Sequence, residues 1–263
     1  MRPYLAVLSA RIRMLLQYRA AALAGMTTQL FWGLIRVMIF EAFYRTALEQ
    51  QPMTYAEVVN YVWLGQALLA LLPLLPDDDV RTMVRTGTVA YELARPVDLY
   101  AFWYSRALAN RIAPTLLRSV PLFCLAFLFF GLQAPASPAA AAAWALAMVG
   151  AVLLAGALSN LVNVTLLWTI AGEGSSQILT VCVLVFSGMI VPLPLFPDAL
   201  QPLLDFLPFR GLADTPYRLY MGHIPASQVW SVVGHQLAWT LTLVGLGRFL
   251  LHRGTRRLVV QGG

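Results

Sequence analysis

Three consecutive aspartates, Asp77–Asp79, form the densest group of chemically active side chains in the sequence. Clustered carboxylates can hold a divalent cation and, through it, a diphosphate. A DDxxD motif of that kind needs a further acid at position 81 or 82, where this sequence has Arg81 and Thr82. The aspartates are therefore better explained as the first turn of a helix, because carboxylates interact favourably with the positive end of the helix dipole.

The other residue types on which enzymes depend are scattered. The three histidines, His223, His235 and His252, form no HExxH motif, and no GxSxG motif occurs. All 18 basic residues are arginine, so the chain lacks the lysine of a Walker A nucleotide site. Cys124 and Cys182 lie in apolar runs and indicate neither a disulfide framework nor a metal site. We therefore expect no catalytic, cofactor or metal-binding residue on this chain.

The composition explains where such a chain can fold. Apolar residues make up 59% of it and charged residues 11%, whereas a soluble domain carries about 25% charged residues. This excludes an ordinary soluble protein, a disordered chain and a nucleic-acid-binding domain. The composition predicts an all-α polytopic membrane protein, with residues 1–263 forming a single domain.

Six segments are long and apolar enough to cross a bilayer, which takes roughly 20 residues. The predicted spans are residues 20–44, 55–75, 113–132, 139–170, 177–195 and 229–251. The third helix is expected to begin earlier, near Leu99, because its apolar part alone is too short. The fourth span has small or short side chains at every fourth position, which favours close helix packing over contact with a substrate. These positions are Ala147, Ala151, Ala155, Ser159 and Asn163.

The arginines predict the orientation. Fourteen of the 18 arginines lie in three places: before the first span, in the connection from the second span into the start of the third, and at the end of the chain. Only Arg45, Arg210 and Arg218 fall on the other side. Since basic residues are retained in the cytoplasm, both termini are predicted to be cytoplasmic.

Three segments outside the spans have their own patterns. Residues 3–19 repeat leucine and isoleucine at helical spacing, which predicts an amphipathic interfacial helix or a continuation of the first span. Residues 77–98 predict short amphipathic helices with a turn at Gly87, suited equally to docking a partner or to a solvated loop. Residues 197–225 are rich in proline and too apolar for a free loop, which predicts a re-entrant helical segment.

Two motifs resemble a known family. The stretch GTVAYELARPVDLY (87–100) resembles the first cytoplasmic loop of a branch of bacterial permeases, which ends in Leu-x-Arg-Pro. The stretch SGMIVPLPLFPDALQPLLDFLPF (187–209) resembles the Gly, Pro, Phe-Pro and Leu-Pro series that precedes the last span of that branch. With six spans and about 260 residues, the chain resembles the permease subunit of a type-2 ABC exporter in a bacterial inner membrane.

The resemblance implies partners and sites. Two permeases, identical or sister chains, would sit on two cytoplasmic ABC ATPases, which would bind ATP and Mg. It implies ATPase-coupling residues in 77–98 and an extracytoplasmic gate in 197–225. The coupling candidates are Arg81, Arg85, Glu92 and Arg95, and the gate candidates are Pro197, Pro202 and Pro208. The implied substrate is hydrophobic, amphipathic or lipid-linked. A lipid-modifying enzyme centred on Asp77–Asp79 and an assembly subunit remain as alternatives.

Overall fold

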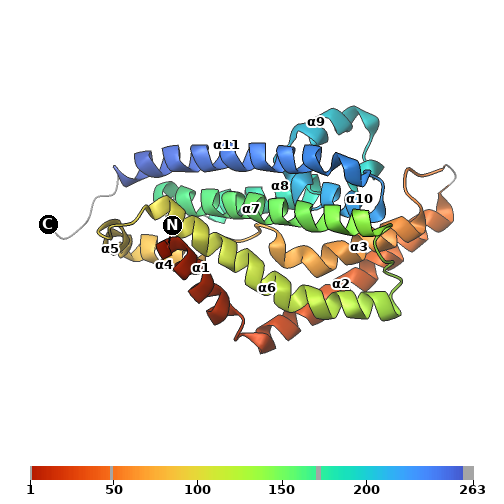
Figure 1. Cartoon of the computed structure of the whole chain (residues 1–263), viewed down its shortest axis with the longest axis horizontal. Helices are drawn as coiled ribbons and strands as arrows, with labels where there is room; N and C mark the ends of the chain where they lie inside the picture. The colour runs from red at the N-terminus through yellow and green to blue at the C-terminus, as the bar shows by residue number, and fades with distance from the viewer. Residues whose placement is uncertain (1, 48–49, 170–172, 257–263) are drawn as a thin grey trace.

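A computed structural model describes residues 2–47, 50–169 and 173–256 of the chain, and this part is helical apart from turns and short connections. Four long helices run along the long axis of the molecule (Figure 1). They are α2 (Arg19–Thr46), α6 (Leu99–Phe129), α7 (Pro138–Thr169) and α11 (Val229–Thr255). Each contains a stretch long and apolar enough to cross a membrane, which confirms four of the six predicted spans.

The other two predicted spans are shorter helices than expected. Helix α3 (Tyr55–Leu68) and helix α8 (Glu173–Phe186) have 14 residues each, about 21 Å, against a hydrocarbon core of about 30 Å. Pro73 and Pro76 follow α3 after one 3-10 turn, Leu69–Leu71. Gly188, in the left-handed conformation (φ +86°), follows α8. These residues end both helices although the sequence stays apolar.

Helix α6 begins at Leu99, as the sequence predicts. Asp98 precedes it and caps it, because the Asp98 carboxylate accepts a hydrogen bond of 2.6 Å from the amide of Ala101. Helix α1 (Arg2–Leu15) ends before α2 begins at Arg19, so α1 is a separate helix and packs along α6. The tyrosine hydroxyl of Tyr4 accepts a bond from the amide of Asp98 at 3.0 Å.

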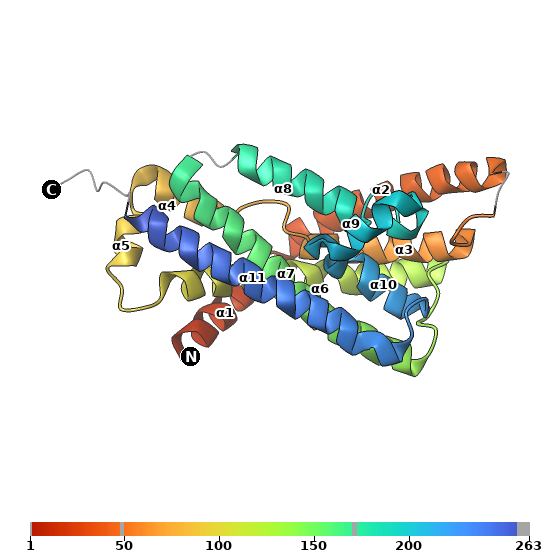
Figure 2. The same cartoon turned by 90° about the horizontal axis from the view of Figure 1, so that it is seen from above.

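Helix α7 is the centre of the bundle, with α11 lying along it (Figure 2) and α6 on another side. Its predicted stripe of small residues is buried, which confirms the packing interpretation. Ala147, Ala151 and Ala155 have no exposed surface, and Ser159 and Asn163 are exposed by 4% and 1%. Backbones approach closely here because the side chains are small.

The proline-rich segment before α11 contains short helices, as predicted. They are α9 (Gln201–Phe206), α10 (Asp214–Met221) and the 3-10 turns Leu193–Leu195, Asp198–Leu200 and Pro208–Leu212. Helix α10 packs on α7, and its Asp214 is buried, accepts a hydrogen bond from Tyr61 at 3.1 Å and pairs with Arg218 at 3.6 Å. The segment is thus part of the bundle and not a free loop.

Candidate functional site

Helices α4 (Asp78–Thr86) and α5 (Val89–Leu93) lie at one end of the molecule, opposite the end that carries α9 and α10 (Figure 1). Asp77 is the N-cap of α4, and its carboxylate accepts a 3.0 Å bond from the amide of Asp79. This confirms that the aspartates begin a helix. Val80 and Val89 are buried in an apolar cluster with Trp103 of α6 and neighbouring residues of α7. The pair of helices is therefore anchored by one face.

The turn between α4 and α5 depends on Gly87, whose φ is +73°. An added Cβ at Gly87 would meet no atom within 4 Å, so a substitution acts through the backbone conformation alone. We expect Gly87→Val to lower the free energy of unfolding by about 1–2 kcal/mol and Gly87→Asn to lower it less, because asparagine tolerates this conformation. Thermal unfolding of both purified variants measures the difference. Equal losses would show that backbone strain is not the cause.

A charge cluster holds α4 and α5 to the rest of the molecule. Its members come from α1, the start of α4, α5 and α6, and they are Arg11, Asp77, Asp79, Glu92 and Arg106. The Arg106 guanidinium lies 3.3 Å from a carboxylate oxygen of Asp77 and 2.8 Å from one of Asp79. Arg11 reaches the same Asp79 oxygen at 2.7 Å. Two arginines from two helices thus share the acids at the start of α4.

Two asparagines complete the hydrogen bonding of Asp77. The amide of Asn110 on α6 donates to the Asp77 carboxylate at 3.1 Å, and the side-chain oxygen of Asn163 on α7 accepts from the Asp77 backbone amide at 2.9 Å. The Asp77 side chain is only 3% exposed, so its charge depends on these partners. The hydrogen bond from Arg11 lowers the pKa of Asp79 and so favours its ionised form.

The four predicted coupling residues separate into two groups. Glu92 is buried, accepts a 2.7 Å bond from the Trp103 indole and lies 3.9 Å from Arg106, so the structure places it inside the chain and not on a surface. Arg85 and Arg95 are exposed, and Arg81 is partly exposed and lies 3.5 Å from Asp78. The prediction grouped Glu92 with the arginines because helical spacing alone does not show which face is covered.

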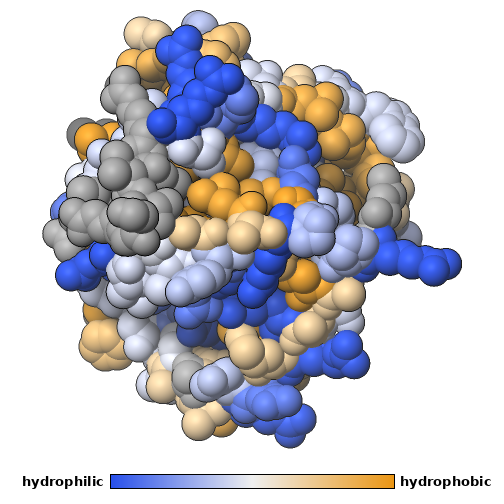
Figure 3. All heavy atoms as spheres, turned by 90° about the vertical axis from the view of Figure 1, so that its left-hand side faces the viewer, coloured by the Kyte–Doolittle hydropathy of each residue, from blue (hydrophilic) through white to orange (hydrophobic). Residues whose placement is uncertain are grey.

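We give the name α4–α5 surface to four exposed side chains of α4, of α5 and of the residues just after α5: Arg85, Tyr91, Leu93 and Arg95. Tyr91 is 75% exposed and Leu93 40% exposed, between two arginines. Figure 3 looks onto this end of the molecule and shows hydrophilic side chains around apolar ones. An aromatic and a leucine flanked by arginines have the composition of a protein-binding surface.

The three predicted gate prolines lie at three different short helices. Pro197 precedes the turn Asp198–Leu200, Pro202 lies in the first turn of α9, and Pro208 begins the turn Pro208–Leu212. Pro197 and Pro202 are exposed, and Pro208 is buried. Each proline therefore begins or shapes a different short helix at the end of the molecule opposite α4.

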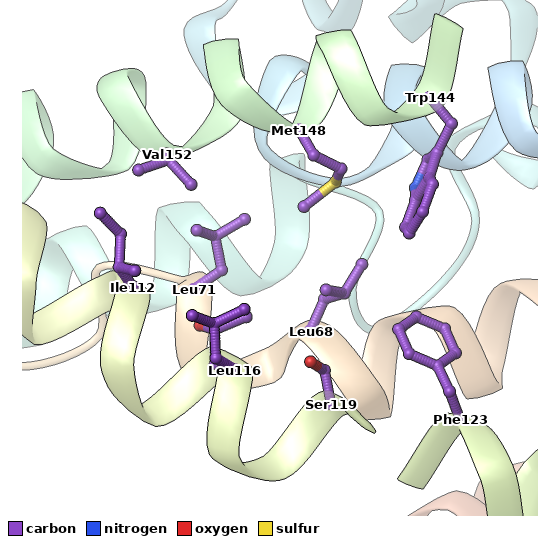
Figure 4. Close-up of a pocket in the computed structure, with 10 residues that line it drawn as sticks. Leu68, Leu71, Ile112, Leu116, Ser119, Phe123, Trp144, Met148 and Val152 are labelled. Carbon is purple, nitrogen blue, oxygen red and sulfur yellow. The ribbon is translucent and has the colours of Figure 1, made fainter. Parts of the chain in front are cut away.

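An apolar cavity of about 210 Å³ lies between α3, α6 and α7 (Figure 4). Its lining is apolar except for Thr115 and Ser119, and Figure 4 shows the side chains of Ile112, Leu116 and Ser119 on α6 opposite Met148 and Val152 on α7. A second apolar cavity of about 400 Å³ shares Phe123 and Trp144 with it. Both suit hydrocarbon and offer little to a polar ligand.

Several residues of the site were not predicted. Arg11, Arg106 and the two asparagines were not identified as members of a site, because their partners lie far away in sequence. One signal was present: Arg106 falls on the apolar helix α6, and a charge on such a helix needs a partner or a route to the headgroups.

Among the described residues, four helices are long and apolar enough to cross a membrane, and they pack into one bundle. The chain belongs to the ABC-2 family transporter proteins, whose family model matches residues 30–262. It is a membrane-embedded transport permease and not itself catalytic; permeases of this family generally work with an ABC ATPase. No curated protein matches the sequence significantly.

Proposed function

We propose that this permease is the membrane half of an ATP-driven exporter in a bacterial inner membrane. The α4–α5 surface would face the cytoplasm and dock onto a separate ABC ATPase. The observation that supports this most is the charge cluster, because it ties the exposed surface to α1 and α6 through Arg11 and Arg106. A force applied to α4 by the ATPase would therefore reach several helices together.

The proposal includes six crossings and cytoplasmic termini. Helix α3 with its 3-10 turn, Tyr55–Leu71, extends about 27 Å, which nearly crosses the hydrocarbon core. Helix α8 would complete its crossing with the turns that follow it. Helix α1 would lie at the interface, where its exposed Leu5 (63%) and Met14 (39%) would contact lipid.

Two permeases, identical or sister chains, would form the transport route together with two ATPases that bind ATP and Mg. Helices α2 and α8 support this, because both expose large apolar side chains: Phe31 by 64%, Met38 by 67% and Ile178 by 69%. Helices α2, α3 and α8 would line the route. The segment 197–225 would re-enter the membrane and close the outer side, with Pro197, Pro202 and Pro208 setting its turns. The substrate would be hydrophobic, amphipathic or lipid-linked.

The first test is affinity purification of the permease from native membranes in mild detergent, with mass spectrometry of its partners. We expect a P-loop ATPase in roughly equal amount, and a second permease if the complex is a heterodimer. If no ATPase is recovered even after crosslinking, the exporter proposal fails, and assays of lipid chemistry or of assembly would test the alternatives.

The second test is reversal of charge on the α4–α5 surface. We expect Arg85→Glu and Arg95→Glu to abolish stimulation of the co-purified ATPase, because each places a carboxylate where the partner meets an arginine, while membrane insertion stays normal. Arg45→Glu is the matched control: Arg45 is exposed at the opposite end, and its ion pair among the described residues is with Glu41 of its own helix. Normal ATPase stimulation in both test variants would show that this surface does not couple the permease to the ATPase.

A further inference from the structure

Helix α6 carries three arginines, and their contacts differ. Arg106 pairs with Asp77 and Asp79. Arg111 donates to the backbone oxygens of Leu72 at 2.6 Å and Leu75 at 3.5 Å. The Nε atoms of Arg111 and Arg118 are both buried without an acceptor, but Arg118 has no hydrogen bond or ion pair at all among the residues that the structure describes. One of three arginines on the same apolar helix therefore lacks the partner that the other two have.

Neither α6, which carries Arg118, nor α2, which packs against it, supplies an unpaired acid among the described residues. The Arg118 guanidinium lies against Gly25 of α2, so closely that a Cβ at Gly25 would come within 2.6 Å of Cζ. Helix α6 has no acid, and the single acid of α2, Glu41, pairs with Arg45 at 2.6 Å. A guanidinium beside apolar helices without an acceptor is unfavourable. Gly25 leaves a notch in α2 that the guanidinium itself fills, so an acceptor must reach the guanidinium from outside the notch and from outside these two helices.

The position of the notch identifies the acceptor's source. Gly25 is six residues from Arg19, the start of α2, which is about 9 Å along the helix. In the proposed orientation the start of α2 lies on the cytoplasmic side, so the guanidinium can reach the phosphate groups of the inner leaflet. A guanidinium offers paired N–H donors that match a phosphate, and it binds phosphate in this forked geometry better than a lysine does.

We propose that Arg118, whose guanidinium is seated in the notch at Gly25, binds the phosphate group of an anionic amphiphile in the cytoplasmic half of the bilayer. The inference rests on the proposed function only for the orientation of the chain. The amphiphile is either a bilayer phospholipid that remains bound or the transported molecule on its way into the route. Both present the same chemistry, a phosphate on a hydrocarbon body.

Binding of a defined lipid to the purified permease, without any ATPase, tests the site. The probes are dioleoylphosphatidylglycerol and dioleoylglycerol, which share their acyl chains and differ in the phosphate headgroup. Native mass spectrometry should show bound dioleoylphosphatidylglycerol and little dioleoylglycerol. We expect Arg118→Gln to weaken the phosphatidylglycerol complex at least tenfold and Arg118→Lys to weaken it less.

Further variants separate loss of the site from loss of the fold. Gly25→Val keeps the arginine but displaces its guanidinium from the notch, and it should weaken phosphatidylglycerol binding as Arg118→Gln does. Arg13→Gln removes an exposed arginine of α1 that contacts only the backbone of its own helix, and it should leave binding unchanged. Equal phosphatidylglycerol binding by all these variants, with melting temperatures near that of the parent protein, would overturn the proposal.

The two sources are distinguished with the complete transporter in nanodiscs. Release of the bound lipid during ATP turnover identifies it as cargo, and retention identifies it as a structural ligand. Because lipid binding is measured without the ATPase, the result for Arg118 can be interpreted even if the exporter proposal fails. Displacement of the lipid by millimolar inorganic phosphate would contradict a site for an amphiphile and indicate a site for the free anion.

Discussion

Replacing Arg106 with alanine is expected to lower the free energy of unfolding by about 3–5 kcal/mol, because removing one partner of a buried ion pair leaves the others uncompensated. The Arg106 side chain is 11% exposed and lies among three acids, of which Asp77 and Glu92 are only 3% and 7% exposed. Without Arg106, Glu92 keeps only the Trp103 indole among these partners. Thermal unfolding in detergent measures the loss, and proteolysis within 77–98 should become faster than in the parent protein.

The matched control is Arg81→Ala. Arg81 also pairs with an acid at the start of α4, but its partner Asp78 is 89% exposed at 3.5 Å, and exposed pairs contribute little. We expect its stability to stay within about 0.5 kcal/mol of the parent protein. Similar losses in Arg106→Ala and Arg81→Ala would show that the charge cluster does not hold α4 in place.

Gly150→Val is expected to lower the free energy of unfolding by about 3 kcal/mol, because Gly150 lies where α7 contacts α11. Gln236 of α11 is completely buried and donates from its side-chain amide to the backbone oxygens of Ala147 at 3.0 Å and Gly211 at 2.7 Å. A Cβ at Gly150 would come within 2.8 Å of the Gln236 amide carbon. The substitution therefore combines overpacking, about 1–3 kcal/mol, with the loss of buried hydrogen bonds. Thermal unfolding again measures the effect.

Gly245→Ala is the control for Gly150→Val, since an added Cβ on α11 at Gly245 meets no atom within 4 Å. It should leave stability unchanged or raise it by up to about 1 kcal/mol, because alanine favours helix more than glycine does. Shortening Gln236 to alanine in the Gly150→Val background should restore part of the loss. A double variant less stable than both single variants would exclude the steric explanation.

Local signals in the sequence predicted much of the fold. Asp77 begins α4, Gly87 ends it and Leu99 begins α6, because caps, turns and chain breaks depend on neighbouring residues. The predicted lengths of the spans that contain α3 and α8 were wrong for a physical reason. Hydropathy measures the cost of placing side chains in lipid. Pro73 and Pro76 end a helix through the backbone, and the hydropathy of an apolar run does not show this effect.

The site was harder to predict than the helices. Arg85 and Arg95 could be identified by their position in an amphipathic loop. The pairing of Arg11 with Asp79 spans 68 residues of sequence and that of Arg106 with Asp77 spans 29, so both depend on how α1 and α6 pack. Glu92 shows the same limit, because only the position of Trp103 decides that it faces inward.

The bond between Asp77 and Asn163 has a consequence for how the chain is made. Its two members are 86 residues apart, and α6 and most of α7 are synthesised between them. At about 5–20 residues per second, the ribosome needs roughly 4–17 s to reach Asn163 after Asp77. Arg106 is made 29 residues after Asp77 and can neutralise the acids of α4 before Asn163 is made, but until then the Asp77 amide lacks its partner on α7. Newly made α4 therefore completes its contacts only when α7 has left the ribosome, and in the proposed exporter an ATPase would be recruited to the α4–α5 surface late in biogenesis.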